Sequence, residues 1–311
     1  MNSGEGLIYK STGSWYLLRD KEGRIWKARV RGKLKIDEAI AATNPVAVGD
    51  VVLFDVEEDD ANTAMIRDIK KRKNYIVRVS PHNRHHKHVV AANLDCALVI
   101  ATLAEPRTSI GFIDRFLVTA EAYHIPVILV VNKQDLHQEK QEQQLADWKR
   151  IYGDAGYEII LVSALDSASV KALRERIGES TTLFSGHSGV GKSTLINALL
   201  PELSIKTMEV SDWSGKGQHT TTFAEMYDLP GGGKIIDTPG VKEFGLIDME
   251  REEVAHYFPE MLRLLPQCRF NNCIHINEPG CAVKAAVQAG SLSSERYSSY
   301  LSILETLNSD R

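Results

Sequence analysis

A glycine-rich loop carries the most specific chemical signal in the sequence: Gly186-His187-Ser188-Gly189-Val190-Gly191-Lys192-Ser193, followed by Thr194. An apolar segment expected to form a strand precedes it, and a helix is predicted from Thr194 to Leu200. The glycines let the backbone curl so that successive N–H groups point at phosphates, and the helix N-terminus adds a favourable dipole. Lys192 should reach the outer phosphates, and the Ser193 hydroxyl should ligate Mg2+. The flanking strand and helix argue against a merely structural turn.

A second motif, Asp237-Thr238-Pro239-Gly240, follows an apolar strand expected at Lys234 to Ile236. Asp237 can hold the coordination shell of the same Mg2+, and the Gly240 amide can contact the terminal phosphate. Between the two motifs stand Thr220, Thr221 and Thr222, where a switch threonine is expected. The tetrapeptide alone is a weak signal, so its weight comes from the phosphate loop before it.

The base should be recognised by Asn132-Lys133-Gln134-Asp135, which follows a strand expected from Pro126 to Val131. The Asp135 carboxylate can accept two hydrogen bonds from guanine, whereas adenine would leave it unpaired. Sites built to hydrogen-bond a substrate group reject analogues that lack it by ~10⁴ or more. Ser163-Ala164, after the next strand, would back the base with an amide. Either segment alone could be an exposed turn, but an exposed turn does not explain their joint spacing from the phosphate loop. Guanine is therefore the expected base, and the Asp135 carboxylate argues against an ATPase.

These motifs stand in an inverted order, because the guanine motif precedes the phosphate loop. Read as a circle, they regain the order of an ordinary GTPase. The helix predicted from Val170 to Ile177 runs almost directly into the phosphate-loop strand, where the usual chain ends would have been joined. Neighbouring termini make such a joining tolerable. The sequence therefore predicts a circularly permuted GTPase sheet.

Hydrolysis needs a group that orients water, and many GTPases place Gln after Asp-x-x-Gly, where this chain has Val241. A partner or another residue must then compensate, since supplied activation can be worth ~10³ to 10⁵ in rate. His219 is the best internal candidate, beside the switch threonines in a glycine-bounded stretch expected to be mobile. An exposed loop histidine without a catalytic role is weighted nearly equally on these grounds.

Three of the four cysteines gather near the C-terminal end with one histidine: Cys268, Cys273, His275 and Cys281. Four such ligands suit a closed tetrahedral Zn2+ site, which would be structural and contribute ~10 kcal/mol to local folding. A catalytic zinc is disfavoured because no position stays open for water. A redox cluster is a weaker alternative because the spacing contains no C-x-x-C pair. Cys96, on an apolar strand, is expected to be an ordinary buried residue.

The elements that must position these residues fall into three patterns. Short alternating strands between residues 6 and 70 fit a small barrel of the oligonucleotide-binding (OB) type, although an SH3-like barrel would give the same pattern. From about residue 93, apolar strands alternate with helices, as in a parallel sheet. Helices are expected to flank the metal ligands, from about Arg251 to Leu265 and from Ala282 to Leu307.

Aromatic and basic side chains on the predicted barrel could stack on bases and contact phosphates. They are Trp15, Tyr16, Trp26, Lys27, Arg29, Arg31, Lys33 and Lys35. Trp15 and Trp26 could equally belong to the barrel core, which is commoner for Trp on a strand.

Charge is distributed unevenly, because residues 1–90 hold 17 Lys and Arg against 12 Asp and Glu in a chain whose net charge is -4. The segment Lys70 to His88 contains seven Lys or Arg, four His and no acidic residue. This density suits phosphate contacts or a solvated basic linker equally well. The N-terminal residues lack a signal-peptide core and no apolar run approaches a spanning helix, so a cytosolic protein is expected.

Taken together, these motifs resemble those of the circularly permuted, small-subunit-dependent GTPases of the RsgA (YjeQ/YloQ/EngC) family, over essentially the full length. The resemblance implies an α/β multidomain protein with an N-terminal OB-fold β-barrel, a circularly permuted P-loop GTPase domain and a C-terminal α-helical zinc-binding domain. It implies a GTP phosphohydrolase that acts in late maturation of the 30S subunit, binds 16S rRNA and is stimulated by the 30S particle. It also favours His219 as the water-positioning residue.

From the motifs and the resemblance we expect three domains, at residues 1–72, 73–245 and 246–311, with a basic linker at the start of the second. We expect a cytoplasmic, monomeric protein. It should hold one structural Zn2+, and Mg2+ should bind alongside GTP. An RNA-binding checkpoint module with incidental GTP turnover is the alternative. The expected GTP-binding residues are Asn132, Lys133, Gln134, Asp135, Ser163, Ala164, Gly186, His187, Ser188, Gly189, Val190, Gly191, Lys192, Ser193, Thr194, Thr220, Thr221, Thr222, Asp237 and Gly240.

Overall fold

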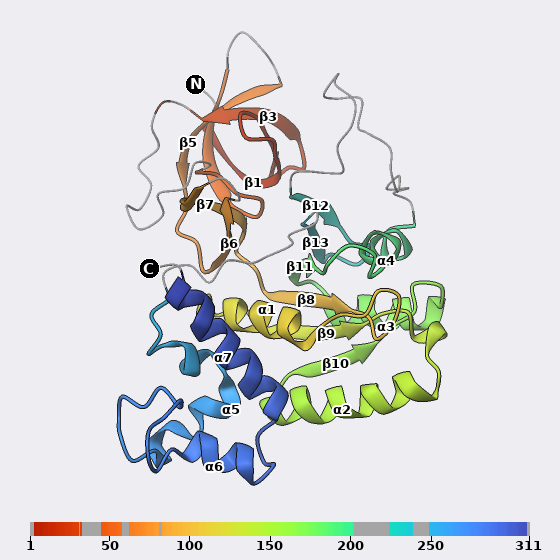
Figure 1. Cartoon of the computed structure of the whole chain (residues 1–311). Helices are drawn as coiled ribbons and strands as arrows, with labels where there is room; N and C mark the ends of the chain where they lie inside the picture. Colours follow the sequence, from red (N-terminus) through yellow and green to blue (C-terminus); the bar gives the residue numbers. More distant parts are fainter. Residues whose placement is uncertain are drawn as a thin grey trace.

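The computed structural model describes residues 3–30, 32, 45–57, 62–80, 83–201, 224–238 and 249–309 (Figure 1), and for residues 79–87 and 308–309 the backbone alone. The expected site residues His219, Thr220, Thr221, Thr222 and Gly240 lie outside the described residues. In Figure 1 the N-terminal barrel lies at the top, a large sheet in the middle and a set of short helices at the bottom.

The N-terminal part is a closed barrel of five strands. They are β1 (Ser3–Ser11), β2 (Tyr16–Asp20), β3 (Ile25–Val30), β4 (Val51–Val56) and β5 (Thr63–Ile69). Their order is β1-β2-β3-β5-β4, and β4 pairs back with β1 to close the barrel. Only the β3–β5 pair among these strands is parallel. The OB-type barrel expected from the strand pattern is thereby confirmed.

Alternating residues fill the barrel core, as the two-residue period of a strand requires. Ile8, Leu18, Phe54 and Ile66 are buried there together with Trp26. Trp15, in the β1–β2 turn, is instead 37% exposed and lies beneath the Arg29 guanidinium at 5.9 Å. Of the two tryptophans, one is core and the other is surface.

The basic segment after the barrel differs from the linker expected there, because it contains a β-hairpin. Strands β6 (Tyr75–Ser80) and β7 (Asn83–Ala92) pair antiparallel as a separate two-stranded sheet. Val77 and Val89 pack on Ala47, and the Tyr75 ring meets the Tyr123 ring at 5.0 Å. Strand pairing and these apolar contacts, rather than solvation, set the path of this segment.

The central sheet contains five parallel strands and one antiparallel edge strand. In chain order the strands are β8 (Cys96–Ala101), β9 (Val127–Val131), β10 (Glu158–Leu161), β11 (Thr181–Ser185), β12 (Glu225–Asp228) and β13 (Lys234–Asp237). Their spatial order is β10-β9-β8-β11-β13-β12, and β12 is the antiparallel member. The guanine-motif strand and the phosphate-loop strand therefore lie on opposite sides of β8.

Helices cover both faces of this sheet. They are α1 (Ile110–Ala122), α2 (Glu139–Ala155), α3 (Ser167–Ile177) and α4 (Lys192–Leu199), with a 3-10 turn η1 (Gln134–Leu136) before α2. Residues Ala97, Val99 and Ala101 of β8 pack with α1 and α2, whereas Leu98 and Ile100 pack with α3 and α4. A strand whose successive side chains are all buried needs apolar layers on both faces, which explains the continuous apolar runs in the sequence.

The C-terminal part is made of short helices around the cysteine cluster. They are η2 (Val254–Tyr257), α5 (Pro259–Leu262), η3 (Leu265–Gln267), α6 (Ala282–Gln288) and α7 (Ser294–Ser309). The two long helices predicted on either side of the cluster were wrong in extent. Pro259 is the first residue of α5 and Pro266 the second of η3, since proline is tolerated in the first turn of a helix but not in its interior. Gly290, at φ 73°, follows α6 and separates it from α7.

Contacts among the described residues join the three parts. Barrel strand β1 pairs antiparallel with β12 at Lys10 and Glu225, so the barrel continues the edge of the central sheet. Beside this junction, Asp228 accepts from the Tyr9 hydroxyl at 2.8 Å and from Arg19 at 2.6 Å. At the other side of the molecule α7 lies along α1 (Figure 1).

Candidate nucleotide and metal sites

The phosphate loop lies between β11, which ends at Ser185, and α4, which begins at Lys192. Gly191 has φ 83°, and a Cβ there would stand 2.5 Å from the Asn132 side-chain nitrogen. A Cβ on Gly186 would stand 2.6 Å from the Ile100 carbonyl oxygen. Both positions therefore require glycine, which lets the loop approach the neighbouring strands closely.

Asn132 joins the base motif to the phosphate loop. Its side-chain nitrogen donates to the Val190 carbonyl at 2.8 Å across 58 residues of sequence, and the residue is 1% exposed. The two motifs that stand apart and inverted in the sequence are thus one site in space. This geometry is what the circular reading of the motif order requires.

Asp135 lies at the carboxyl end of β9, in the turn η1. Lys133, before it, has φ 62°, and the Gln134 N–H donates to the Val162 carbonyl at 3.2 Å. The Ser163 hydroxyl donates to the Asp135 carboxylate at 2.5 Å. These bonds place the two expected base-recognition segments side by side at one edge of the sheet.

Leu165 is a residue of this edge that sequence reasoning missed. It follows Ser163-Ala164, and at 81% exposure it is the most exposed of the large apolar side chains among the described residues.

Lys192 and Asp237 form an ion pair in the site. Their side chains are 11% and 15% exposed. Thr238 fixes the end of β13 by donating to the Phe184 carbonyl at 2.9 Å. Ser193 is exposed at the N-terminus of α4. The carboxylate of Asp237 and the hydroxyl of Ser193 are oxygen ligands of the kind that Mg2+ prefers, so the donor set fits that ion.

A loop that the sequence analysis did not single out also contacts the site. It follows β8, and its Thr108 hydroxyl oxygen lies 2.8 Å from Nε2 of His187 in the phosphate loop. The carbonyl of Glu105, in the same loop, accepts from the Lys133 ammonium. No motif marks these residues, because their role arises only from where the fold places them.

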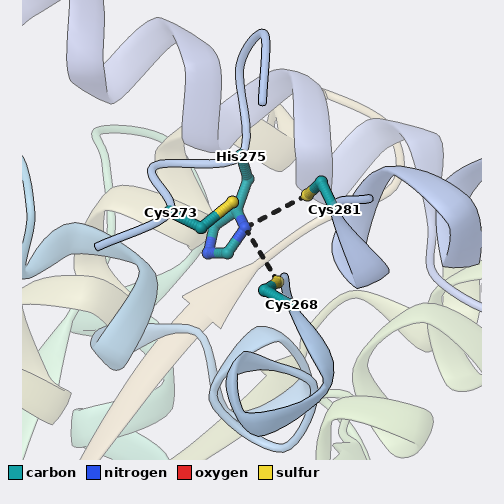
Figure 2. A group of neighbouring side chains, drawn as sticks. All are labelled: Cys268, Cys273, His275 and Cys281. Carbon is teal, nitrogen blue, oxygen red and sulfur yellow. Dashed lines mark hydrogen bonds between the residues drawn. The ribbon is translucent and has the colours of Figure 1, made fainter. Parts of the chain in front are cut away.

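The four expected metal ligands converge (Figure 2). One ligand atom from each of Cys268, Cys273, His275 and Cys281 lies within 4.8 Å of the others. His275 Nδ1 is 3.3 Å from the Cys281 sulfur and 3.7 Å from the Cys268 sulfur. Three thiols and one imidazole nitrogen facing a common centre fit a closed tetrahedral metal site.

Burial shifts the pKa of two of these ligands, His275 and Cys273. It lowers the pKa of His275, which favours the neutral imidazole that a metal requires, and it raises the pKa of Cys273 to about 12. A bound cation would displace the thiol protons. Cys96 lies elsewhere, half-buried on β8, where burial raises the pKa of its thiol to about 11.

Glu278 organises the backbone between the ligands. Its carboxylate accepts from the N–H groups of Ile274, Ile276 and Asn277 at 2.8, 2.9 and 3.0 Å. Tyr297 donates to the His275 carbonyl at 2.6 Å, and Tyr300 donates to the Ile274 carbonyl at 2.7 Å. The ligand loop is therefore held on one side by a carboxylate and on the other by α7.

Comparison with known proteins gives a consistent picture. Residues 5–66 match the model of the RsgA N-terminal domain family, and residues 69–247 match that of the RsgA GTPase family. A small ribosomal subunit biogenesis GTPase RsgA of Flavobacterium psychrophilum is 50% identical, covering 96% of this chain and 92% of the relative. Its namesake in Bacteroides fragilis (strain ATCC 25285) is 48% identical, covering 97% and 96%.

Solved structures are similar over the whole chain. The crystal structure of YjeQ from Thermotoga maritima superposes with a TM-score of 0.77 at 30% identity, covering 100% of both chains. That of YloQ, described as a circularly permuted GTPase, gives 0.73 at 27% identity, covering 100% of this chain and 96% of the other. Among the described residues, no helix is both long and apolar enough to cross a membrane.

Proposed function

The chain belongs to the RsgA GTPase family of small ribosomal subunit biogenesis factors, and from this premise we propose that it binds 16S rRNA on the 30S subunit and that GTP hydrolysis, stimulated there, releases it. The observation that carries the proposal is the β1–β12 pairing. It makes the barrel continuous with the sheet whose strand β13 delivers Asp237. RNA contact and nucleotide chemistry then share one sheet.

The nucleotide residues have separate roles in this proposal. Lys192 neutralises the outer phosphates, Asp135 accepts from guanine, and His219 orients the attacking water. Mg2+, held through Ser193 and Asp237, would supply charge stabilisation at the transferred phosphoryl group. Asn132 keeps the base segment against the phosphate loop through the Val190 carbonyl.

The metal of the C-terminal domain is proposed to be a structural Zn2+ held by Cys268, Cys273, His275 and Cys281. Support comes from the convergence of four soft donors and from the lowered pKa of His275, which burial keeps neutral. Since all four positions would be taken by protein, the ion would fix the fold and leave chemistry to the nucleotide site.

RNA binding is proposed for the exposed basic face of the barrel. Trp15 lies exposed beneath Arg29, and Lys27 is exposed on the same strand as Arg29. An aromatic ring beside a guanidinium is a surface on which an unpaired base can stack while phosphates are neutralised. We propose that the protein is cytoplasmic and acts as a monomer on the particle.

Multiple-turnover GTP hydrolysis with and without purified 30S particles tests the enzyme role. Many-fold stimulation supports it, whereas unchanged turnover favours an RNA-binding checkpoint module whose GTP hydrolysis is incidental. Binding to 30S should also weaken steeply between low and high salt, and should differ between GDP and a GTP analogue. Binding that ignores both would contradict the release model.

His219→Ala tests the proposed water-positioning group. The variant should bind GTP as tightly as the parent chain and hydrolyse it more slowly, with and without 30S. Loss of nucleotide affinity in place of turnover would show that His219 serves binding instead.

A further inference from the structure

Thr108 is buried at the end of the loop that follows β8, and its position is fixed by Thr102. The Thr102 N–H donates to the Thr108 hydroxyl oxygen at 2.9 Å, and the Thr108 N–H donates to the Thr102 carbonyl at 2.8 Å. The Thr102 hydroxyl donates in turn to the Pro106 carbonyl. Thr108 is 1% exposed and Thr102 is 0% exposed. The two buried threonines therefore fix the position of the Thr108 hydroxyl.

That contact is His187, the second residue of the phosphate loop. Thr108 Oγ1 lies 2.8 Å from His187 Nε2, and His187 Nδ1 lies 3.0 Å from the Ser188 carbonyl oxygen. A carbonyl only accepts, so Nδ1 carries a proton and donates it. Because Thr108 Oγ1 already accepts from Thr102, its own proton can go to Nε2. One neutral tautomer thus satisfies every link of the chain.

The contact between His187 and the Ser188 carbonyl affects the next amide of the loop, the Gly189 N–H. The Ser188 carbonyl and the Gly189 N–H belong to one planar trans peptide, so they point in opposite directions. Holding the carbonyl toward the imidazole therefore directs the Gly189 N–H away from the imidazole. Pro106 supports the same peptide, since a Cβ on Gly189 would lie 3.1 Å from its Cδ.

We propose that Thr108 is a positioning residue for nucleotide binding, which acts through His187 to aim the Gly189 N–H at a phosphate. The inference rests on the proposed nucleotide site. The loop that contains Thr108 also contacts the base motif, because its Glu105 carbonyl accepts a hydrogen bond from the Lys133 ammonium. One segment therefore supports both the base motif and the phosphate loop. Because GDP and GTP both carry phosphates that a loop amide can contact, the affinity for each nucleotide depends on Thr108.

Thr108→Val tests this, because valine keeps the shape and removes the hydroxyl. Affinity for a fluorescent GDP should fall about fivefold to thirtyfold, the effect of one buried hydrogen bond. Thr108→Ser, which keeps the hydroxyl, should restore affinity to near the parent value. The thermal midpoint without nucleotide, measured alongside, reports any general loss of folding. A folded Thr108→Val protein with parental GDP affinity overturns the proposal.

His187→Ala separates positioning from a merely structural role. Its side chain is half-buried in a loop, so the variant should fold, and it should lose GDP affinity to a similar degree. In the His187→Ala background, Thr108→Val should cost nothing further, because its route to the loop is gone. A full additional loss there, or parental affinity in His187→Ala alone, overturns the proposal. If the parent chain itself bound no guanine nucleotide, the proposed function would fail and not the positioning role.

Discussion

At the scale of single residues, the nucleotide site is held by bonds that cross large sequence separations. Asn132 reaches Val190, Lys192 pairs with Asp237, and Thr108 contacts His187. Each pair brings together groups from different strand ends, which is the general position of ligand sites in α/β sheets. Single substitutions at these residues should therefore affect nucleotide binding far more than folding.

Lys192→Ala should abolish hydrolysis, because it removes the ammonium that we propose neutralises the outer phosphates. Lys234→Ala is the matched control, since Lys234 lies on β13 and its nearest charged partner, Asp228, is 4.0 Å away. Single-turnover hydrolysis measures both. Normal turnover in Lys192→Ala would exclude the loop as the catalytic phosphate site.

Glu278→Gln should make the metal domain less stable at neutral pH. Although partial burial acts in the opposite direction, the backbone N–H groups of Ile274, Ile276 and Asn277 lower the pKa of Glu278 from its ordinary 4.5. A carboxyl group with a lowered pKa contributes its full stabilisation above pH 4.5. That contribution to the free energy of unfolding is lost as the pH falls through the pKa of the group in the folded state.

Urea unfolding of the zinc-loaded chain from pH 7 to pH 3 measures this. The difference between Glu278→Gln and the parent should shrink at the acid end, where the parent carboxylate is itself protonated. Glu305→Gln, an exposed carboxylate on α7, should match the parent throughout. A constant difference at all pH values would contradict the role of the carboxylate charge.

At the scale of elements, α1 is the helix that joins the nucleotide domain to the metal domain. Its Asp114 receives Arg296 of α7 at 2.7 Å, and Arg296 also donates to Glu260 of α5 at 2.7 Å. Arg296 and Asp114 are 1% and 0% exposed. Although burial disfavours its charge, the two carboxylates raise the pKa of Arg296 above its ordinary value. The domain contact therefore depends on a buried cation.

Arg296→Leu should cost about 3–5 kcal/mol, the usual effect of breaking a buried ion pair. Burial raises the pKa of Asp114, and Arg296 opposes that rise. Without Arg296, folding requires Asp114 to take up a proton, so the variant should lose stability relative to the parent as the pH rises from 5 to 8.

Denaturant unfolding at several pH values checks the sign. Arg296→Leu combined with Asp114→Leu should recover much of the loss and its pH dependence, because the fully buried Asp114 carboxylate is then removed and the partly exposed Glu260 alone has lost its partner. A single variant that is equally stable at pH 5 and pH 8, relative to the parent, would contradict the assignment.

Sequence patterns predicted the elements whose signal is local. The barrel and the parallel sheet follow from alternation and from continuous apolar runs, and the phosphate loop from its glycines. The hairpin of β6 and β7 was missed because its strand Asn83–Ala92 begins with six polar residues, so apolar alternation does not mark it. The helices that flank the cysteine cluster were predicted too long because each predicted range contains a breaker, Pro259 in the first and Gly290 in the second. Thr108 had no signal, since its role depends on tertiary proximity alone.

At the scale of the whole molecule, the permuted order puts the Asp237 strand last in the sheet, directly before the C-terminal domain along the chain. A change at β13 can therefore act on that domain through a short connection. In an unpermuted order the same strand would be followed by the rest of the sheet.

A flexible Gly-Ser insertion after Gly245 should uncouple the two events, so that 30S still stimulates hydrolysis while release of the protein slows. The same insertion in the exposed β2–β3 turn, at Glu22, is the control and should leave both unchanged. Hydrolysis and release are measured on the same 30S complexes by phosphate production and sedimentation. Normal release from the first variant would show that the connection carries no signal.

The strand order also has a meaning for biosynthesis. Strands β8, β9 and β10 are contiguous in the chain and adjacent in the sheet, with α1 and α2 covering one face. Domains fold in the order in which synthesis delivers them. The segments expected to recognise guanine are thus translated before β11 and the phosphate loop, whereas Leu98 and Ile100 of β8 still lack the α4 residues that bury them. Because the Asn132 side chain is held by the Val190 carbonyl, the base segment and the phosphate loop can form one site only after both have been synthesised.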